Sequence, residues 1–596
     1  MVERWTTAFQ EDLKKIQSLD LQDHERQLYN QALFAENRLM AHLAKDDQME
    51  VNEGLYEDLD FFTTDNPVIN HLDRTQTIFG SSYLKLLIKT PLANPNHLKA
   101  RQSILQTLGD QPETTVRLAH HLDQCQALAD DLIWFWKPQS PETQHLWDIV
   151  YYKPSWLKFL NQSPKALNVT SYLGIYILPL IQVLSPLIPI IAIYFMMRQV
   201  DPNLNFGMIS EMIGEIYQIR SATRYHLFAL IVWGLLYLYG IYSTITNAIL
   251  QYRVIALLHT KLHQLTVFKN EAKALYRIYQ DHCPLDRTID HNAIQRALAY
   301  FDALADLDRP PRLLDNKGHT LSLYEAIRHQ EDFKVNLGLL IQFTGYIDCL
   351  VSTRALCREG YTWTQYLAEP QRPVIYFGQI WHPCLDRGQA VFNSSLINTH
   401  RILTGPNAGG KSTYIKNVAI LILLAQTLTL CNAGKSRLTP IKRLHTYIHL
   451  VDTKGVESLY EAEMNRAYAF LTQIKALRPH EKVVAIFDEL FTSTNIYEGV
   501  AAAKTLCEEF ISYPNLLTLL TTHYTELTHL ERLTGGQFKN FKVSCKRNQG
   551  EIIFDYKIRP GISDQFVALD LLKRKGFDPH IIDRALDHLS ALKGKA

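Results

Sequence analysis

A run of ten residues, Thr404 to Thr413, has the composition and spacing of a phosphate-binding loop. It contains the pattern G-x-x-x-x-G-K-S, in which glycines let the backbone wrap a chain of phosphates and the lysine adds a positive charge beside the outer ones. The apolar stretch 401–403 before it predicts a buried strand, and the apolar stretch 414–430 after it predicts a buried helix. The N-terminus of that helix would direct N–H groups at the same phosphates. The predicted nucleotide site is Gly405, Pro406, Asn407, Ala408, Gly409, Gly410, Lys411, Ser412 and Thr413, with the Ser412 hydroxyl placed to bind Mg²⁺.

Two later apolar runs end in residues that could act on a bound nucleotide. Residues 483–487 are continuously apolar, as in a strand buried on both faces of a parallel sheet, and Asp488 and Glu489 follow them. Asp488 could hold Mg²⁺ directly or through water, and Glu489 could orient and deprotonate an attacking water. Residues 516–520 form a third apolar run, which leads into His523, a side chain that could reach the outer phosphate. We therefore predict Glu489 and His523 as catalytic residues and Asp488 with Ser412 as Mg²⁺ ligands.

The order and spacing of these motifs resemble those of the MutS mismatch-repair ATPases, a branch of the ABC-type fold. The loop matches the family form T-G-P-N-x-G-G-K-S-T, and residues 488–490 and 497–499 match D-E-[IL] followed by Y-[DE]-G. Residues 522–527 match T-H-Y-x-E-L, and residues 381–383 contain the H-P that opens the family's ATPase domain. The resemblance covers about residues 375–592. It implies a C-terminal α/β ATPase domain of the ABC type that uses ATP and Mg²⁺.

The resemblance also implies contacts between two copies of the chain. Ser458 resembles the family serine that faces the nucleotide of the partner subunit, and residues 563–592 resemble the family's dimerising helix-turn-helix, so a homodimer is expected. A plain pair of packed C-terminal helices is the alternative. Phe392 stands where the family keeps an aromatic residue and is a candidate to stack on adenine. Residues 491–496 depart from the family's G-R-G-T-S-T, because they lack its glycines and arginine.

Two long stretches without charge lie in the middle of the chain. No charged residue occurs between Lys165 and Arg198, and residues 172–197 are apolar enough to cross a bilayer as a tilted helix. Residues 227–250 form a second such stretch. Buried core helices are the alternative, but they rarely run so long without a polar stripe. We predict a transmembrane hairpin, with both termini on the cytosolic side where ATP is found, in the plasma or inner membrane if the source is bacterial.

A helical domain is predicted on both sides of the hairpin. Residues 72–104 follow the MutS-core pattern L-D-x-T, G, L-L, P and R-Q-x-I, and residues 347–350 resemble the family's returning lever helix. An unrelated helical domain is the alternative. The predicted organisation is an N-terminal helical segment (1–58), the first half of an all-α MutS-core-like lever domain (59–165), the hairpin (166–253), the second half of the lever domain (254–372), the ATPase domain (373–562) and a C-terminal segment (563–596).

Composition weighs against nucleic acid and against a metal or disulfide scaffold. The formal net charge is +1, whereas a nucleic-acid-binding domain is normally clearly basic. The eight cysteines include no C-x-x-C pair, which argues against a zinc site and fits a reducing compartment. The family's mismatch-reading domain is not recognisable. Phe9-Gln10-Glu11 has the spelling of its F-x-E wedge, but Phe9 lies on the apolar face of an amphipathic stretch and is predicted to be core.

Three functions follow from these observations. The favoured hypothesis is a membrane-anchored MutS-like ATPase that uses ATP to drive rearrangement of a dimer and its lever helices. The second is a membrane-tethered protein that binds mismatched or branched DNA. The third is a component of an ABC-type transporter, which is disfavoured because two spans are few for a pathway and neither contains a charged residue.

Overall fold

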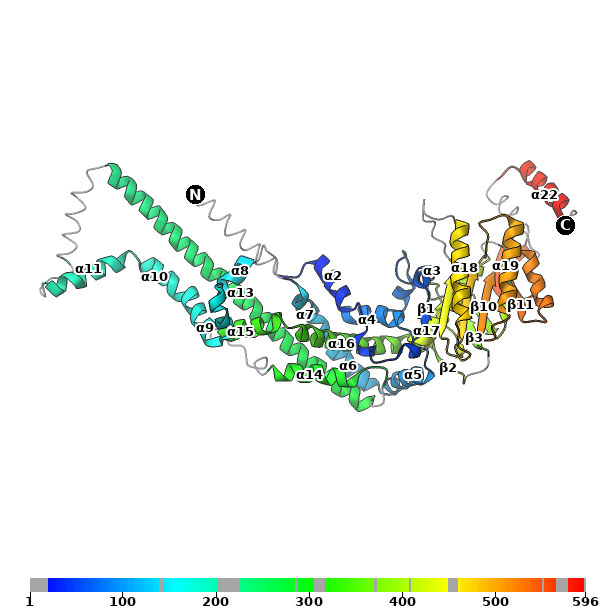
Figure 1. Cartoon of the computed structure of the whole chain (residues 1–596), viewed down its shortest axis with the longest axis horizontal. Coiled ribbons are helices and arrows are strands. Elements are labelled where there is room, and N and C mark those ends of the chain that lie inside the picture. Colours follow the sequence, from blue (N-terminus) through cyan, green and yellow to red (C-terminus); the bar gives the residue numbers. More distant parts are fainter. Residues whose placement is uncertain are drawn as a thin grey trace. The chain divides into compact units, whose positions relative to one another are not determined.

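The computed structural model describes residues 20–138, 144–200, 207, 224–283, 287–304, 317–368, 372–406, 409–448, 459–548, 551–563 and 577–593 (Figure 1). The chain divides into two compact units. The helical unit comprises the chain up to Leu33 together with Gln124–Ala274 and Asn292–Ile341. The α/β unit comprises Phe34–Asp123, Leu275–His291 and Gln342–Ala596. The presence of a mixed α/β domain and a helical part confirms the broad fold class predicted from the sequence.

A seven-stranded sheet organises the α/β unit. Its strand order is β1-β8-β9-β10-β5-β11-β12, and every neighbouring pair is parallel except β11 and β12. The strands are β1 (Glu50–Val51), β5 (His400–Thr404), β8 (Arg443–Tyr447), β9 (Val483–Asp488), β10 (Leu516–Thr521), β11 (Phe538–Asn548) and β12 (Glu551–Pro560). The three runs predicted as strands from their apolar composition are β5, β9 and β10, which lie side by side in the sheet.

Helices cover the buried strands of this sheet. α18 (Leu459–Lys475) and α19 (Ile496–Phe510) lie against the sheet (Figure 1). Their apolar residues pack on alternate residues of β9 and β10, in one cluster that includes Phe470, Phe487 and Phe510. Val484 and Ile486, which alternate with the β9 residues of that cluster, are also fully buried. Burial on both faces explains why β9 is a continuous apolar run rather than an alternating one. α17 (Lys411–Thr427) contacts β9 and β10. It corresponds to the helix predicted over 414–430, but each of its ends lies three residues earlier in the chain.

A second sheet of five strands lies in the same unit, in the order β4-β3-β7-β2-β6. Its strands are β2 (Thr362–Tyr366), β3 (Ile375–Ile380), β4 (Asn393–Ile397), β6 (Leu430–Cys431) and β7 (Lys435–Leu438). The remaining helices with residues in this unit are α3 (Leu55–Asp58), α4 (Ile78–Lys89), α5 (Pro95–Asp110), α6 (Pro112–Ala127), α20 (Leu530–Leu533) and α22 (Pro579–Lys593). α6, α13 (Arg224–His282), α14 (His291–Ala303) and α16 (Glu331–Arg358) each contribute residues to both units.

The N-terminal segment differs from the helical stretch expected over residues 1–58. Its described part contains α2 (Asp23–Leu33) and then the short strand β1, which pairs in parallel with β8 at the edge of the seven-stranded sheet. Lys442 fixes this pairing, because its ammonium donates to the carbonyl oxygens of Lys45 (2.8 Å) and Gln48 (2.7 Å). Tertiary pairing thus overrides local periodicity in a strand too short to be recognised from sequence.

The two segments that carry the lever-domain resemblance meet inside the α/β unit. Asp348, on α16 (Glu331–Arg358), accepts hydrogen bonds from the Thr77 backbone N–H and hydroxyl, both at 2.7 Å. The Thr77 hydroxyl in turn accepts from the Gly80 N–H at 2.8 Å and caps α4. A buried carboxylate therefore joins the start of α4 to α16, which explains an aspartate in an otherwise apolar stretch of helix.

The helical unit is built from helices throughout its described residues. They are α2, α7 (Ala129–Ile133), α8 (Gln144–Val150), α9 (Pro164–Tyr172), α10 (Leu178–Leu184), α11 (Leu187–Val200), α13 (Arg224–His282), α14 (His291–Ala303), α15 (Lys317–Arg328) and the first part of α16, with the 3₁₀ segment η5 (Ser155–Gln162) and a π-helical turn η6 (Leu173–Ile177). α13 is continuous over 59 residues, so the boundary expected at residue 253 falls inside one helix.

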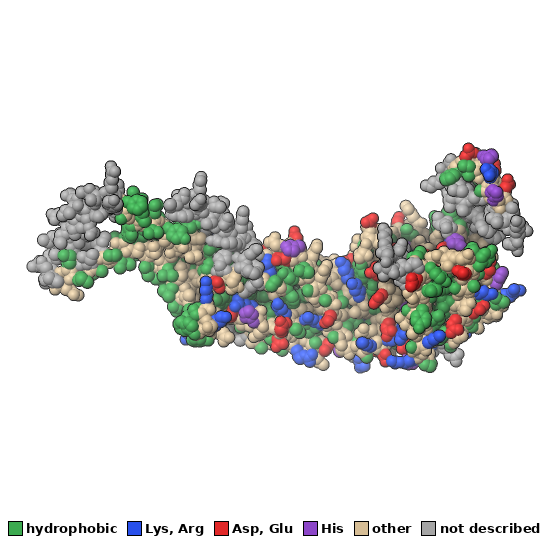
Figure 2. All heavy atoms as spheres, turned by 45° about the horizontal axis from the view of Figure 1, so that its top comes forward, with side chains coloured by type: hydrophobic (Ala, Val, Ile, Leu, Met, Phe, Trp, Pro, Cys, Tyr) green, Lys and Arg blue, Asp and Glu red, His purple; other side chains and the backbone are tan. Residues whose placement is uncertain are grey.

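Two described helices are long and apolar enough to cross a membrane by length and composition. Glu331–Arg358, within α16, is 83% buried over its most apolar window, as a core helix is. Pro164–Leu184, which contains the first half of the first predicted span, is only 11% buried. Hydrophobic side chains on this stretch and on the start of α13 lie at the surface (Figure 2). Those with at least half of their area exposed include Tyr172, Leu178, Leu180, Phe228, Trp233, Leu236 and Leu238.

Candidate nucleotide site

The glycine-rich loop joins the end of β5 to the start of α17. Thr404 is the last residue of β5 and Lys411 the first of α17. Gly410 caps the helix with a φ of +88°, which a residue with a side chain adopts only under strain. Ser412 and Thr413 follow in the first turn of α17, while Asn407 and Ala408 lie outside the described residues. The described part therefore has the strand–loop–helix form that the motif requires.

Lys411 points back along this loop. Its ammonium donates hydrogen bonds to the carbonyl oxygens of Gly405 at 3.0 Å and Pro406 at 3.3 Å, and it lies 3.4 Å from Nε2 of His523. Burial lowers the pKa of Lys411, and the nearby Glu489 and Asp488 carboxylates oppose that shift. The cation is thus held inside the loop before any phosphate arrives.

The parallel register brings the predicted acid and histidine residues to one edge. Thr521 of β10 lies opposite Asp488 of β9 and Leu403 of β5. The Thr521 hydroxyl donates to Oδ1 of Asp488, and the Thr521 carbonyl accepts from the Glu489 N–H at 3.2 Å. Glu489 has a φ of +61°, an uncommon value for a non-glycine residue. The backbone turns at Glu489 directly after β9 ends, beside the end of β10.

Glu489 and His523 form a close pair. Oε1 of Glu489 lies 2.8 Å from Nε2 of His523. The hydrogen bond from His523 lowers the pKa of Glu489, against burial, which raises it, and the Lys411 charge adds to the lowering. Glu489 is therefore a carboxylate at neutral pH. An ionised acid beside an imidazole and an ammonium, at a helix N-terminus, can bind phosphate and accept a proton from water.

The two predicted Mg²⁺ ligands, Ser412 and Asp488, carry oxygen groups of the type that binds this ion. Mg²⁺ is usually held in nucleotide sites by one or two protein oxygens together with phosphates and water. Ser412 supplies a hydroxyl in the first turn of α17, and Asp488 supplies a carboxylate at the end of β9. The described residues contain no cluster of three or more His, Cys, Asp or Glu side chains that could hold a metal by themselves. These residues therefore suit a Mg²⁺ site in which a bound nucleotide supplies the other ligands.

A cavity of about 430 Å³ opens beside the loop. Gly410, Thr413, Tyr414 and Asn417 line one side of it, and Trp381, His382 and Tyr556 line another. Burial lowers the pKa of His382 to about 4, so its imidazole is neutral at physiological pH. The size and aromatic lining of this cavity suit a planar base attached to phosphates in the loop.

Phe392 is not among the described residues that line this cavity, although its neighbours Val391 and Asn393 are. Its ring meets Trp381 edge-on at 6.1 Å between centroids. Tyr556 lies nearer the loop, because a Cβ placed on Gly410 would be 3.1 Å from its ring. Sequence reasoning missed Tyr556. It sits at a register shift between β11 and β12 with a φ of +51°, and neither feature has a recognisable sequence signal.

Side-chain hydrogen bonds hold the segment that departs from the family pattern, and two of them link it to α18 and to Tyr524. The Ser493 hydroxyl donates to Oε2 of the buried Glu463 on α18 at 2.8 Å, and the Tyr524 hydroxyl donates to the Phe491 carbonyl at 2.8 Å. Ser458 lies outside the described residues, as do Val567 and Leu571 of the expected dimerising segment.

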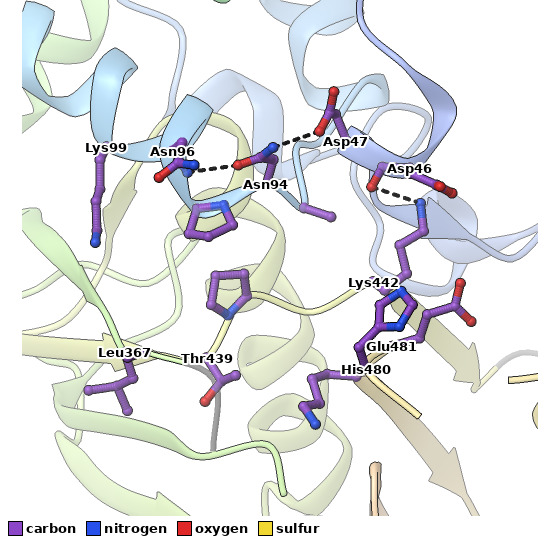
Figure 3. A pocket seen from close by; sticks show the side chains of 15 residues that line it. Asp46, Asp47, Asn94, Asn96, Lys99, Leu367, Thr439, Lys442, His480 and Glu481 are labelled. Atoms are coloured by element: carbon purple, nitrogen blue, oxygen red, sulfur yellow. Dashed lines mark hydrogen bonds between the residues drawn. The ribbon is translucent and has the colours of Figure 1, made fainter. Parts of the chain in front are cut away.

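A second cavity, of about 380 Å³, lies between the N-terminal segment and the ends of β7 and β9 (Figure 3). Its polar residues largely bond one another. Asn94 donates to Oδ1 of Asp47 at 2.7 Å and accepts from the Asn96 N–H at 2.8 Å, and the Lys442 ammonium is taken up by backbone carbonyls. This cavity lies between two parts of the α/β unit. The described residues that line it form no arrangement suited to phosphate chemistry.

Comparison with known proteins agrees with the site. Residues 401–593 match the protein family described as MutS domain V. A DNA mismatch repair protein MutS from Pelotomaculum thermopropionicum is 32% identical over 221 residues, which cover 36% of this chain and 25% of that protein. One from Clostridium botulinum is 30% identical over 259 residues, which cover 42% of this chain and 27% of that protein. The chain thus spans about a quarter of the length of the curated relatives it matches.

Proposed function

We propose that this chain, whose carboxy-terminal domain belongs to the MutS family, binds ATP with Mg²⁺ and hydrolyses it. The observation that carries the proposal is the contact of three side chains at neighbouring strand and helix ends. The Lys411 ammonium lies 3.4 Å from Nε2 of His523, and the same nitrogen lies 2.8 Å from the Glu489 carboxylate. Phosphate binding, contact with the outer phosphate and activation of water each need one of these groups.

Each group has a separate role in this proposal. Lys411 and the N–H groups at the start of α17 bind the phosphates, and Ser412 and Asp488 hold Mg²⁺, which neutralises phosphate charge. Glu489 orients a water molecule and takes its proton as the water attacks the outer phosphate and the bond from that phosphorus to the oxygen of the leaving ADP breaks. His523 contacts that phosphate. Tyr556 is a better candidate than Phe392 to contact the base, because it lines the cavity beside Gly410.

We further infer that residues 166–253 anchor the chain in a membrane, with spans at about 172–197 and 227–250. Two observations support this: the low burial of Pro164–Leu184, and the exposed large apolar side chains on that stretch and on the start of α13. In water such a surface would be exposed at a high free-energy cost, whereas in a bilayer it contacts lipid chains. Both termini then lie on the cytosolic side with the ATP.

At the Pro186 kink of the first span, two backbone carbonyls have side-chain hydrogen-bond partners. Pro186 lacks an N–H and cannot bond the carbonyl of Gln182, four residues back. The Gln182 carbonyl accepts from the Ser185 hydroxyl at 2.8 Å, and the Val183 carbonyl accepts from the Tyr237 hydroxyl of α13 at 2.7 Å. An unpaired carbonyl costs several kcal/mol in hydrocarbon and little in water, so side-chain partners at a proline kink favour the bilayer interpretation.

ATP binding is proposed to drive rearrangement of a homodimer and of its lever helices. The expected dimer contact at the C-terminus is consistent with α22, on which Ile581 is 54% exposed. Ser458 would contact the nucleotide of the partner subunit. Sedimentation of the Glu489→Gln variant with ATP should detect the dimer, and monomers alone under those conditions would count against it.

The ATPase proposal is tested with the full chain purified in detergent. It should hydrolyse ATP in the presence of Mg²⁺ and stop when EDTA removes the metal. Lys411→Met should weaken ATP binding by at least about tenfold, since a hydrogen bond to a charged group contributes about 1.5–3 kcal/mol. Lys435→Met, which removes an exposed lysine of the same unit, should bind ATP as the parent does. Unchanged ATP affinity in Lys411→Met would remove the basis of the proposal.

DNA repair is the second candidate, because the relatives are named as mismatch repair proteins. A mismatch reader needs an apolar wedge presented on a domain that reaches the duplex. The N-terminal segment has two F-x-E triplets, of which the one at Phe9 lies outside the described residues and the one at Phe34 has its phenylalanine buried. A near-neutral chain tethered to a membrane is also poorly suited to scanning DNA.

We therefore expect no more than about a threefold preference for mismatched over matched duplex, where one good discriminating contact gives about 1–3 kcal/mol. Filter binding to both duplexes over a series of salt concentrations measures this ratio and separates specific from phosphate binding. A reproducible tenfold preference at physiological salt, lost on Phe9→Ala, would restore the repair function.

A further inference from the structure

The segment 151–165, which runs from the end of α8 into the first turn of α9, combines exposed aromatic rings with a local excess of positive charge. It contains Lys153, Lys158 and Lys165 and no acidic residue. Trp156 is 73% exposed and Phe159 is 68% exposed. Trp and Phe side by side with lysines are typical of segments that lie at the surface of a bilayer.

Hydrogen bonds within the segment and to α15 hold these rings at the surface. Asn161, which is buried, accepts from the Tyr152 N–H at 2.8 Å and donates to the Tyr152 carbonyl at 3.2 Å, so it closes the segment across η5. Ser322 of α15 donates to the Gln162 carbonyl at 2.9 Å and fastens the same segment to the helical unit. With its ends fixed in this way, η5 presents Trp156 and Phe159 outward.

Cations gather beside these rings. A cavity of about 500 Å³ is lined by Lys153, Lys158, Arg328 and the tyrosines 151 and 152, together with Asp148 and Glu325. The two acids are already paired, Asp148 with Lys153 at 3.3 Å and Glu325 with Arg328 at 2.6 Å. Lys158 is exposed and forms no ion pair with a residue in the described part of the chain. An anion at this position would therefore meet Lys158 first.

The same surface continues into the base of the hairpin. α9 begins at Pro164, directly after η5, and carries the exposed Val169 and Tyr172. On α13, Gln251 approaches Gly174, since a Cβ on that glycine would lie 2.3 Å from its side-chain oxygen. Tyr252 and Arg253, the next residues of α13, are exposed, so aromatic and basic side chains lie on both helices, where the first charge-free stretch begins and the second ends.

We propose that the segment Tyr151–Lys165 is an interfacial element that binds anionic phospholipid headgroups. Trp156 and Phe159 enter the boundary between headgroups and acyl chains, while Lys153, Lys158 and Lys165 contact lipid phosphates. The inference rests on the proposed membrane hairpin. A lipid surface is favoured over a protein partner because the patch is continuous with the apolar hairpin surface and its charge complements an anionic leaflet.

The test uses the full chain reconstituted into bilayers that contain lipids brominated near the headgroup end of the acyl chains. Bromine quenches tryptophan fluorescence at short range, so the difference between the parent and Trp156→Phe reports Trp156. Trp233→Phe reports Trp233 of α13, which lies within the second proposed span and is 56% exposed. Bilayers are either wholly zwitterionic or contain about one third anionic lipid, in the range where a surface potential attracts lysines.

We expect Trp233 to be quenched in both bilayers and Trp156 to be quenched at least about threefold more in the anionic one, since each lysine near such a surface favours binding by about fivefold. The triple variant K153Q/K158Q/K165Q should lose this difference. The matched variant K99Q/K435Q/K475Q, which removes three exposed lysines of the α/β unit, should keep it.

The outcomes separate the two proposals. Quenching of Trp233 without quenching of Trp156 in anionic bilayers overturns the interfacial element and leaves the hairpin standing. Equal quenching of Trp156 in both bilayers overturns the recognition of anionic headgroups. Protection of Trp156 from acrylamide without quenching by brominated lipid assigns the patch to a protein partner and also overturns the proposal. If neither tryptophan is quenched, the membrane anchor itself fails.

Discussion

Replacing Glu489 by glutamine is expected to leave ATP bound and to lower its hydrolysis by at least about 10²-fold, the lower range for a positioned base. Glutamine keeps the shape of the side chain and an oxygen for His523, which lies 2.8 Å from the carboxylate, but it cannot accept a proton from water. Lys411 and the loop are untouched, so nucleotide affinity should stay within a few-fold of the parent. Single-turnover hydrolysis and nucleotide binding, measured on the same preparation, separate the two effects.

The pH dependence of turnover tests the role of Glu489 independently. The hydrogen bond from His523 lowers the pKa of Glu489, so the carboxylate form persists as pH falls below the range in which an ordinary glutamate takes up a proton. Turnover limited by this base is therefore retained on the acid side until pH falls through the lowered pKa of Glu489. Glu508→Gln on α19, an exposed site, should change neither rate nor profile. Parent-like turnover in Glu489→Gln would show that another group is the base.

Much of the site was predictable because parallel strands deliver their C-terminal ends to one edge. The apolar runs before Thr404, Asp488 and His523 could be recognised individually, and β5, β9 and β10 are neighbours in the sheet, so their following residues converge. The short strand β1 could not be predicted, since two residues carry no periodicity. Nor could the bond of Asp348 to Thr77, which joins residues 271 positions apart.

Tyr556 shows a different limit of sequence reasoning. Its proximity to Gly410 depends on an irregular register between β11 and β12 and on a positive φ, and both are settled by packing rather than by residue type. The structure of the proposed hairpin was predictable only in part. Pro186 predicts a kink, but the partner of the freed backbone, the Tyr237 hydroxyl, comes from a helix whose pairing a composition argument does not specify.

The full chain is expected to sediment with membranes and to remain there through high salt and alkaline carbonate, with release only by detergent. A peripheral protein held by lysines would be released by salt, because screening weakens its attraction to lipid phosphates. The exposed leucine, isoleucine and phenylalanine side chains of the hairpin each favour insertion by about 0.3–0.6 kcal/mol at the centre of a span, and the charge-free stretches contain none of the charged residues that oppose it most strongly.

Arginine substitutions make this prediction specific to the hairpin. Leu180 and Leu236 are 55% and 64% exposed, and an arginine at the centre of a span disfavours insertion by about 2.5–3.5 kcal/mol. Leu180→Arg with Leu236→Arg should therefore release a large fraction of the chain from the carbonate-resistant pellet. Leu533→Arg, at a leucine of the α/β unit that is also 55% exposed, should leave the fractionation unchanged. If exposed apolar area alone decided fractionation, arginine at Leu180, Leu236 or Leu533 would have the same effect. A bilayer around the hairpin predicts release from the pellet only for arginine at Leu180 and Leu236. Recovery of the intact parent chain in the soluble fraction without detergent would instead make α10 and the start of α13 surfaces for another protein.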